Sequence, residues 1–312
     1  MLDVGQSECI LGIRRELRDQ LGRIGRSHEV PHGGAREIWF RRRGVVGHGD
    51  VVMLFASHLQ LQTFCVYWKN PTMTSDELIR TSRLGKKYGD VTALEALDLT
   101  VCAGEIVCLL GANGAGKTTT LQLLLGFTQP SSGQAWIAGV DVAREPQRAR
   151  ARAGYLPEVV ELYPLLDGIE TLAYFEQLAG RRGDADGVAA SLERVGLPSS
   201  AFRRRVATYS KGMRQKLGLA VALAKGADAL LLDEPMSGLD PSAANDLVQL
   251  LRALAGKGAA ILMVTHDIFR AQQAADRIGI MRHGQLVEEV AATAMTPQEV
   301  ERLYVHHLRD AA

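Results

Sequence analysis

The stretch that decides the fold runs from Glu105 to Leu125. It begins with the apolar run Glu105-Ile-Val-Cys-Leu-Leu110, which predicts a buried strand, and it ends in a segment that predicts a helix over Lys117–Leu125. Between them lies Gly111-Ala-Asn-Gly-Ala-Gly-Lys117-Thr118, which matches the phosphate-loop pattern GxxxxGK[ST]. A glycine-rich turn with a chance lysine is the alternative, but the preceding strand and the following helix favour a phosphate loop.

Each part of this loop has a physical role toward a nucleoside triphosphate. The glycines let backbone N–H groups turn toward the phosphates, and the helix N-terminus adds partial positive charge. Lys117 is predicted to reach the outer phosphates, and Thr118 to offer its hydroxyl to Mg²⁺. The predicted nucleotide contacts here are Gly111, Ala112, Asn113, Gly114, Ala115, Gly116, Lys117, Thr118 and Thr119.

A second apolar run supplies the carboxylates that triphosphate hydrolysis needs. Ala229-Leu-Leu-Leu-Asp233-Glu234-Pro235 predicts a central strand that delivers two acids at its carboxyl end, where ligands of such sheets bind. Asp233 is predicted to hold the metal through water, and Glu234 to act as the base that polarises the attacking water. Two acids in a solvated turn are the alternative interpretation.

The surrounding pattern indicates an α/β fold. Further strands are predicted over Leu97–Val101 and Ala260–Val264, and such continuous apolar strands alternating with helices imply a parallel sheet covered on both faces. Between Tyr155 and Lys225 the pattern becomes mainly helical, which predicts an inserted helical subdomain at about 156–225. Its candidate helices are Gly168–Leu178, Gly187–Val195 and Gly212–Ala224.

Composition excludes several classes of protein. The 312 residues are ample for a buried core, and 36 basic against 35 acidic residues create no global field toward nucleic acid. The four cysteines form no CxxC pair, which fits a reducing compartment.

Two further classes of protein are disfavoured by local sequence. The asparagines Asn70, Asn113 and Asn245 are not followed by lysine, so the Asn-Lys-x-Asp motif that recognises guanine is absent. The apolar stretch Val51–Trp68 contains polar residues that disfavour a membrane span.

The first 72 residues differ from the rest. They carry ten basic and seven acidic residues, whereas the remainder has two more acids than bases. A short helix is possible over Ile13–Leu21. One interpretation is an accessory extension. The other, which we favour, is that translation starts at Met73, and an intact mass of the natively expressed protein distinguishes the two.

From about residue 78 to 290 the chain resembles the ATP-binding subunit of an ATP-binding cassette (ABC) transporter. Three further motifs accompany the phosphate loop and the Asp233-Glu234 strand in the family's order, the first of them between these two and the other two after Glu234. These are a signature-like segment Tyr209-Ser-Lys-Gly-Met-Arg-Gln-Lys216, a dimer-loop segment Ser237-Gly-Leu-Asp240 and a switch-histidine segment Val264-Thr-His266-Asp267.

The resemblance implies roles for these residues. Tyr88 would stack on adenine, Ser210 and Gly212 would contact the γ-phosphate of ATP held by a second copy, and Asp240 would lie at the dimer interface. Asp240 also suits the N-cap position before Pro241. His266 would contribute to catalysis beside Glu234 and Lys117.

Two positions depart from the common pattern. Lys211 replaces a glycine of the signature, and Glu158 stands where many cassettes carry glutamine after a Tyr-x-Pro segment. An ionised Glu158 can ligate Mg²⁺, as Thr118 and Asp233 can, but it cannot donate a hydrogen bond. The signature and Glu158 together resemble the subfamily that drives separate exporter permeases.

The resemblance implies a P-loop NTPase core with a mainly parallel sheet, an N-terminal antiparallel β subdomain and the inserted helices. The domains would be an extension 1–72, an ATP-binding domain 73–290 and a helical tail 291–312. ATP and Mg²⁺ would bind, and the partners would be a transmembrane permease and a second cassette, identical or a close paralogue, with no nucleic acid. The location would be the cytoplasmic face of the inner membrane. A soluble cassette ATPase and a module that binds ATP without hydrolysing it are the alternatives.

Overall fold

The computed structural model describes residues 28–32, 35–39, 51–55, 65–68, 76–181 and 184–309, with the side chains of 76–181 and 184–307. The chain divides into two compact units, Met1–Met73 and Thr74–Ala312. The second unit contains all the motifs described above. No helix among the described residues has the length and apolar character needed to cross a bilayer.

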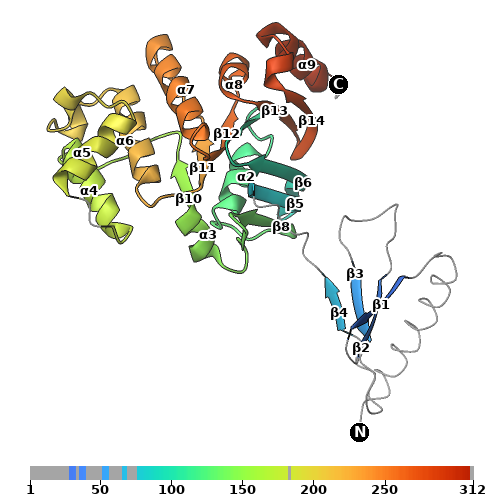
Figure 1. Cartoon of the computed structure of the whole chain (residues 1–312). Helices are drawn as coiled ribbons and strands as arrows, with labels where there is room; N and C mark the ends of the chain where they lie inside the picture. Colours follow the sequence, from blue (N-terminus) through green and yellow to red (C-terminus); the bar gives the residue numbers. More distant parts are fainter. Residues whose placement is uncertain are drawn as a thin grey trace. The chain divides into compact units, whose positions relative to one another are not determined.

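The second unit is built on a six-stranded sheet (Figure 1). Its order is β10-β11-β12-β7-β13-β14, and every pairing is parallel except that of β13 with β14. The strands are β7 (Ile106–Leu110), β10 (Ala153–Leu156), β11 (Ala229–Asp233), β12 (Ala260–Thr265), β13 (Arg277–Arg282) and β14 (Gln285–Ala291). The strands predicted at 105–110, 229–232 and 260–264 are therefore confirmed to within one residue.

A four-stranded antiparallel sheet of order β6-β5-β8-β9 completes the β structure of this unit. Its strands are β5 (Glu77–Tyr88), β6 (Val91–Cys102), β8 (Ser132–Ile137) and β9 (Val140–Asp141). The predicted strand Leu97–Val101 is the second half of β6, because the hairpin with β5 begins as early as Val91. This sheet is the expected antiparallel β subdomain.

Both faces of the parallel sheet are covered, which explains its continuous apolar strands. Alternate strand residues point to opposite faces. Ile106, Leu230 and Ile261 belong to one core cluster with the helices α6 to α9, and their neighbours Val107 and Leu231 belong to another with α2 and the antiparallel sheet. These helices are α2 (Lys117–Leu124), α6 (Lys211–Leu223), α7 (Pro241–Ala255), α8 (Ile268–Ala274) and α9 (Pro297–Arg309).

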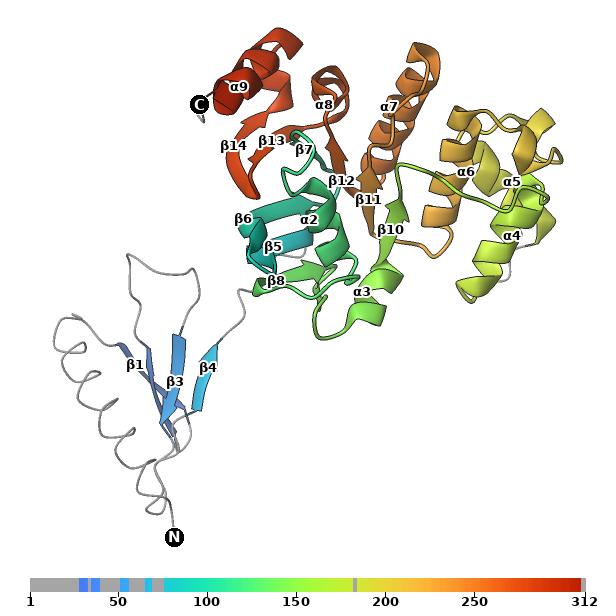
Figure 2. The same ribbon diagram turned by 180° about the vertical axis from the view of Figure 1, so that it is seen from behind.

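The predicted helical insertion contains α4 (Gly168–Leu178), α5 (Ala185–Arg194) and α6, and α3 (Pro146–Arg152) precedes β10. Asp167 caps α4 in a reciprocal capping box with Glu170, and Asp184 and Ser210 cap α5 and α6. Figure 2 shows α6 on the far side of β10 from α2. The insertion therefore lies beside the edge strand of the sheet, while α2 lies near its centre.

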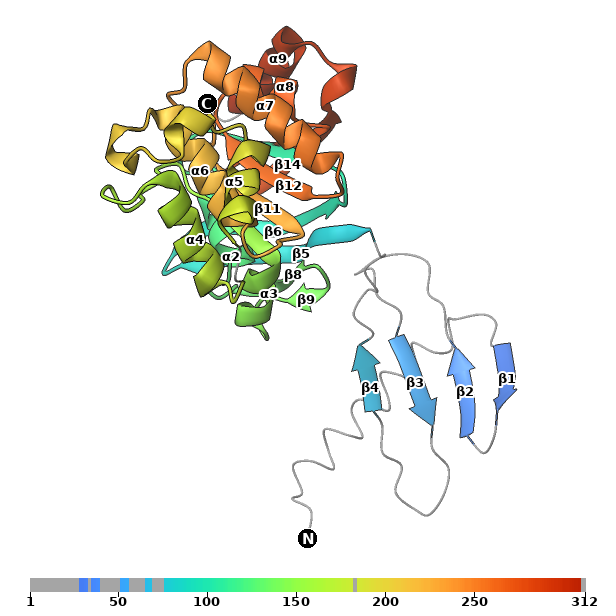
Figure 3. The same cartoon turned by 60° about the vertical axis from the view of Figure 1, so that its left-hand side comes forward.

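The first unit contains a four-stranded antiparallel sheet of order β1-β2-β3-β4, which the sequence analysis did not anticipate (Figure 3). Its strands are β1 (His28–His32), β2 (Ala35–Trp39), β3 (Val51–Phe55) and β4 (Cys65–Trp68). The stretch Val51–Trp68 is thus divided between two paired strands. The helix suggested at Ile13–Leu21 lies outside the described residues.

Candidate nucleotide-binding site

The phosphate loop has the backbone that its glycines allow. Gly116 is the N-cap of α2 with φ +102°, and a Cβ on it would lie 2.7 Å from the backbone oxygen of Ala93. Gly114 also has positive φ. No side chain caps the N-terminus of α2. The first-turn N–H groups are therefore available to an anion, and only glycine fits the N-cap position.

Lys117 lies folded over its own loop. Its ammonium Nζ donates to the backbone oxygens of Gly111 at 2.6 Å and Ala112 at 3.1 Å, and the residue is only 7% exposed. Burial lowers the pKa of Lys117, while the negative charges of Glu234 and Asp233 oppose that shift. The Lys117 ammonium and the carboxylates of Asp233 and Glu234 thus interact electrostatically.

The carboxylates lie where β11 ends. Burial raises the pKa of Asp233, and the charges of Glu234 and Glu158 raise it further. The negative charges of these three acids therefore act on one another at the end of β11. Within the part of the chain that the structure describes, no three His, Cys, Asp or Glu side chains are arranged to hold a metal ion by themselves.

Glu234 is held by two hydrogen bonds from the end of β12. Thr265 Oγ1 donates to Glu234 Oε2 at 2.8 Å, and His266 Nδ1 donates to Glu234 Oε1 at 2.7 Å. Glu234 is 8% exposed and has φ +44°, a left-handed backbone that side chains rarely adopt. The carboxylate is thus oriented from both oxygens. The sequence analysis identified His266 but missed Thr265, although Thr265 adjoins it at the end of the same apolar strand.

The signature residues form a separate group with the dimer loop. Ser210 caps α6 and accepts a hydrogen bond from the N–H of Met213 at 3.2 Å. A Cβ on Gly212 would lie 3.2 Å from the Cβ of Ala243, in the first turn of α7. Asp240 is the N-cap of α7 and precedes Pro241, as the residue types predicted. In one copy of the chain, α6 and α2 lie apart (Figures 1 and 2).

Tyr88 ends β5 and is 47% exposed. The ammonium of Lys86 lies 4.8 Å from the centre of its ring. An exposed ring with a cation on it can still offer a face to a planar base.

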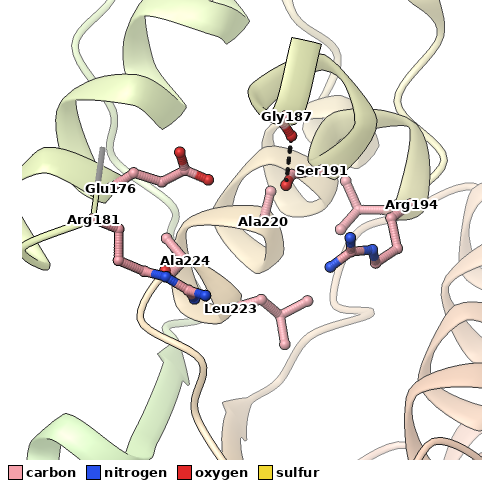
Figure 4. Close-up of a pocket in the computed structure, with 9 residues that line it drawn as sticks. Glu176, Arg181, Gly187, Ser191, Arg194, Ala220, Leu223 and Ala224 are labelled. Atoms are coloured by element: carbon pink, nitrogen blue, oxygen red, sulfur yellow. Dashed lines mark hydrogen bonds between the residues drawn. The ribbon is translucent and has the colours of Figure 1, made fainter. Parts of the chain in front are cut away.

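A cavity of about 310 Å³ lies elsewhere, among α4, α5 and α6 (Figure 4). The guanidinium groups of Arg181 and Arg194 and the carboxylate of Glu176 reach toward it. Arg181 donates to the backbone oxygen of Ala224 at 3.0 Å. None of the predicted nucleotide residues lines this cavity, so it is distinct from the candidate site.

Comparisons with known proteins agree with this architecture. Residues 94–237 match the family model described as ABC transporter. The chain is 35% identical over 232 residues to the uncharacterized ABC transporter ATP-binding protein YdbJ of Bacillus subtilis, and the alignment covers 74% of each chain. It is 38% identical over 217 residues to the Nod factor export ATP-binding protein I of Burkholderia lata, covering 69% of this chain and 71% of that one.

Among solved structures, the chain is similar to the dimeric ATP-binding cassette MJ0796 in a post-hydrolysis state bound to ADP and Pi. The TM-score is 0.62 at 25% identity, and the match covers 69% of this chain and 99% of that one. The fold, the order of the motifs and these relatives agree with one another. The chain therefore belongs to the ABC transporter family, as one of its ATP-binding subunits.

Proposed function

We propose that this chain hydrolyses ATP to power export through a separate transmembrane permease, and that it works as a dimer with a second copy or a close paralogue. The observation that carries the proposal is the orientation of the Glu234 carboxylate. Hydrogen bonds from Thr265 and His266 hold it, and its charge acts on the Lys117 ammonium of the phosphate loop. Export is supported by the relatives, which include the Nod factor export protein and a bacitracin transport ATP-binding protein of Enterococcus faecalis.

The reaction is transfer of the γ-phosphoryl group to water. Water forms a bond to the γ-phosphorus, the bond to the β,γ-bridging oxygen breaks, and ADP and phosphate leave. Glu234 accepts the proton of the attacking water, and Thr265 and His266 hold the carboxylate still for that step. Lys117 and the N–H groups of α2 stabilise the charge on the phosphate oxygens.

The residues present suit Mg²⁺ bound together with the nucleotide. This ion prefers oxygen ligands and is usually held by one or two carboxylates, waters and substrate phosphates, so the lack of a three-residue protein cluster among the described residues is compatible with it. Asp233 and Glu158 supply carboxylates, and Thr118 supplies a hydroxyl. When bound, the ion neutralises charge on the β- and γ-phosphates.

The permease is expected to dock beside Glu158–Leu166, which would hold the chain at the cytoplasmic face of the membrane. Val159, Tyr163 and Leu165 are exposed there, and the ring of Tyr163 packs edge-on against that of the exposed Tyr174 on α4 at 5.7 Å. Large apolar side chains gathered on a surface commonly mark a protein partner site. This surface supports the proposed docking of a permease.

Glu234→Gln tests the proposal. The amide keeps the size of the side chain but cannot take a proton, so turnover should fall by about 10²- to 10⁴-fold while ATP binding persists. Sedimentation of this variant with Mg²⁺ and ATP should show a stable dimer, and the wild type should show a transient one. Near-normal hydrolysis by the variant, or a strictly monomeric variant, would contradict the proposal.

A further inference from the structure

The cavity among α4, α5 and α6 takes no part in the proposed ATP hydrolysis, yet it has the features of a small-molecule site (Figure 4). Its volume of about 310 Å³ is at the lower end of the range for ligand pockets. Val195, Ala220 and Ala224 give it a buried apolar lining. A concave apolar surface with a few polar groups facing it is the usual form of a site for a small organic molecule.

Arg181 is held at this cavity by the end of α4. Gly180 has φ +76°, and the N–H of Arg181 donates to the backbone oxygen of Glu176 at 2.9 Å, which is the Schellman arrangement of a helix C-terminus. The guanidinium donates to the backbone oxygen of Ala224 at 3.0 Å. A Cβ on Gly226 would lie 3.2 Å from Nη1, so the glycine leaves room for the guanidinium. The arginine is therefore fixed, and its other N–H groups remain available to a ligand.

Arg194 lies in the last turn of α5. Figure 4 shows its guanidinium and that of Arg181 pointing into the cavity from different sides. Among the residues whose side chains the structure describes, neither arginine has an ion-pair partner, and the side chain of Arg194 has no hydrogen-bond partner. Two cations that face one cavity repel each other, and an anion between them replaces that repulsion with attraction.

The other polar groups of the cavity narrow the chemistry of the ligand. The hydroxyl of Ser191 donates to the backbone oxygen of Gly187 at 3.0 Å, so its proton is already engaged. The carboxylate of Glu176 also reaches toward the cavity. Together with Arg181 and Arg194 it leaves a net charge of +1 on the three side chains. This balance suits one anionic group and disfavours a second.

We propose that this cavity binds a small organic molecule that carries one oxyanion, a carboxylate or a phosphate, on an apolar body. The oxyanion lies between Arg181 and Arg194, whose forked N–H donors match the oxygens of either group. The apolar body covers Val195 and Ala220. None of the predicted nucleotide residues lines the cavity, so this site is additional to the proposed function and does not depend on it.

Titration calorimetry of the full chain with phenyl phosphate, benzoate and benzyl alcohol tests the proposal. The three probes share an aromatic ring, and the alcohol lacks the charge. The wild type should bind at least one of the two anions and should not bind the alcohol. Tighter binding of phenyl phosphate assigns a phosphate-bearing ligand, and tighter binding of benzoate assigns a carboxylate.

Arg194→Gln is the central variant, because its side chain has no contact of these kinds to lose within the described residues. The variant should weaken binding of the anion by about 10- to 100-fold and leave the melting temperature unchanged. Glu176→Gln should act in the opposite direction. Loss of a negative charge at the cavity should tighten binding of either anion by roughly 2- to 10-fold.

Two further variants serve as controls. Arg302→Gln replaces another exposed helical arginine, on α9, and should bind the probes as the wild type does. Lys117→Ala addresses the phosphate loop, which could also attract phenyl phosphate. This variant should keep the binding that Arg194→Gln loses.

Four results would overturn the inference. The first is that the wild type binds neither anion, and the second is that it binds benzyl alcohol equally well. The third is an unchanged affinity in a chain that carries both Arg181→Gln and Arg194→Gln. The fourth is loss of binding in Lys117→Ala, which would assign the probe to the phosphate loop. None of these measurements uses ATP hydrolysis, so a failure of the proposed function would leave them unaffected.

Discussion

His266 Nδ1 lies 2.7 Å from Glu234 Oε1, although 32 positions separate the two residues along the chain. The contact arises because β11 and β12 are parallel neighbours, so that both carboxyl ends meet at one edge of the sheet. Glu234 follows the end of β11, and His266 follows the end of β12. The hydrogen bond from His266 therefore orients the carboxylate of Glu234, the proposed base.

Thr265 holds the other oxygen of that base, and its hydroxyl should matter for catalysis. Thr265→Val removes the hydrogen bond to Glu234 with little change of shape. A hydrogen bond to a charged group is worth about 1.5–3 kcal/mol, so kcat should fall by about 10- to 100-fold with the Kd for ATP unchanged. Steady-state kinetics and a nucleotide titration measure the two effects.

Thr265→Ser is the control for this prediction. Serine keeps the hydroxyl that donates to Glu234 and accepts from the N–H of Asp267. It should retain most of the activity. Equal activity of the valine and serine variants would show that the hydrogen bond does not assist the reaction.

Lys117→Ala should weaken ATP binding. The ammonium is buried among loop carbonyls, under the influence of the charges of Asp233 and Glu234, and we propose that it contacts the outer phosphates. Loss of a charge-assisted contact predicts an affinity about 10- to 100-fold lower by equilibrium titration. Lys257→Ala, at an exposed position, should bind normally. An unaltered Kd for Lys117→Ala would argue against its role in the phosphate loop.

Gly116→Ala should destabilise the phosphate loop. Its φ of +102° strains any side chain, and the new Cβ would meet the Ala93 oxygen at 2.7 Å. Gly258→Ala is a matched control, since Gly258 has φ +96° but no atom within 4 Å of the added Cβ. The control should cost about 1–2 kcal/mol of unfolding free energy. Gly116→Ala should cost more in urea unfolding and should lose ATP binding. Equal costs would show that the close approach is unimportant.

Asp233→Asn should raise the melting temperature at neutral pH when metal is removed with EDTA. Burial raises the pKa of Asp233 in the folded chain, so the folded state holds its proton more tightly than the unfolded state. Stability then falls as the pH rises from the ordinary aspartate pKa through the raised one, and the ionised carboxylate costs stability above that window. Asparagine removes this cost.

The gain from Asp233→Asn should shrink as the pH is lowered through the same window, because the wild-type carboxyl becomes neutral there. In the presence of Mg²⁺ and ATP, the wild type should instead have the higher melting temperature, because the variant lacks a carboxylate proposed to hold the metal. Thermal melts across pH, with and without Mg²⁺ and ATP, measure both. A pH-independent difference between variant and wild type would refute the electrostatic explanation.

The sequence alone determined the local parts of the site. A phosphate loop is a continuous segment whose glycines, lysine and flanking elements are encoded side by side, and the apolar runs of β7, β11 and β12 predicted strands buried on both faces. The capping residues Asp240 and Ser210 similarly act on N–H groups only three residues away. Such features depend on neighbours in the chain, which periodicity and residue type reveal.

Only the tertiary structure decided which distant residues meet. The pair Thr265–Glu234 depends on the strand order of the sheet, and the presence of Arg181 and Arg194 at one cavity depends on how α4, α5 and α6 pack together. The four strands of the first unit were likewise not evident from its weak pattern. Strand order and helix docking are set by the packing of side chains that lie far apart in sequence, and the local pattern of residues carries little information about that packing.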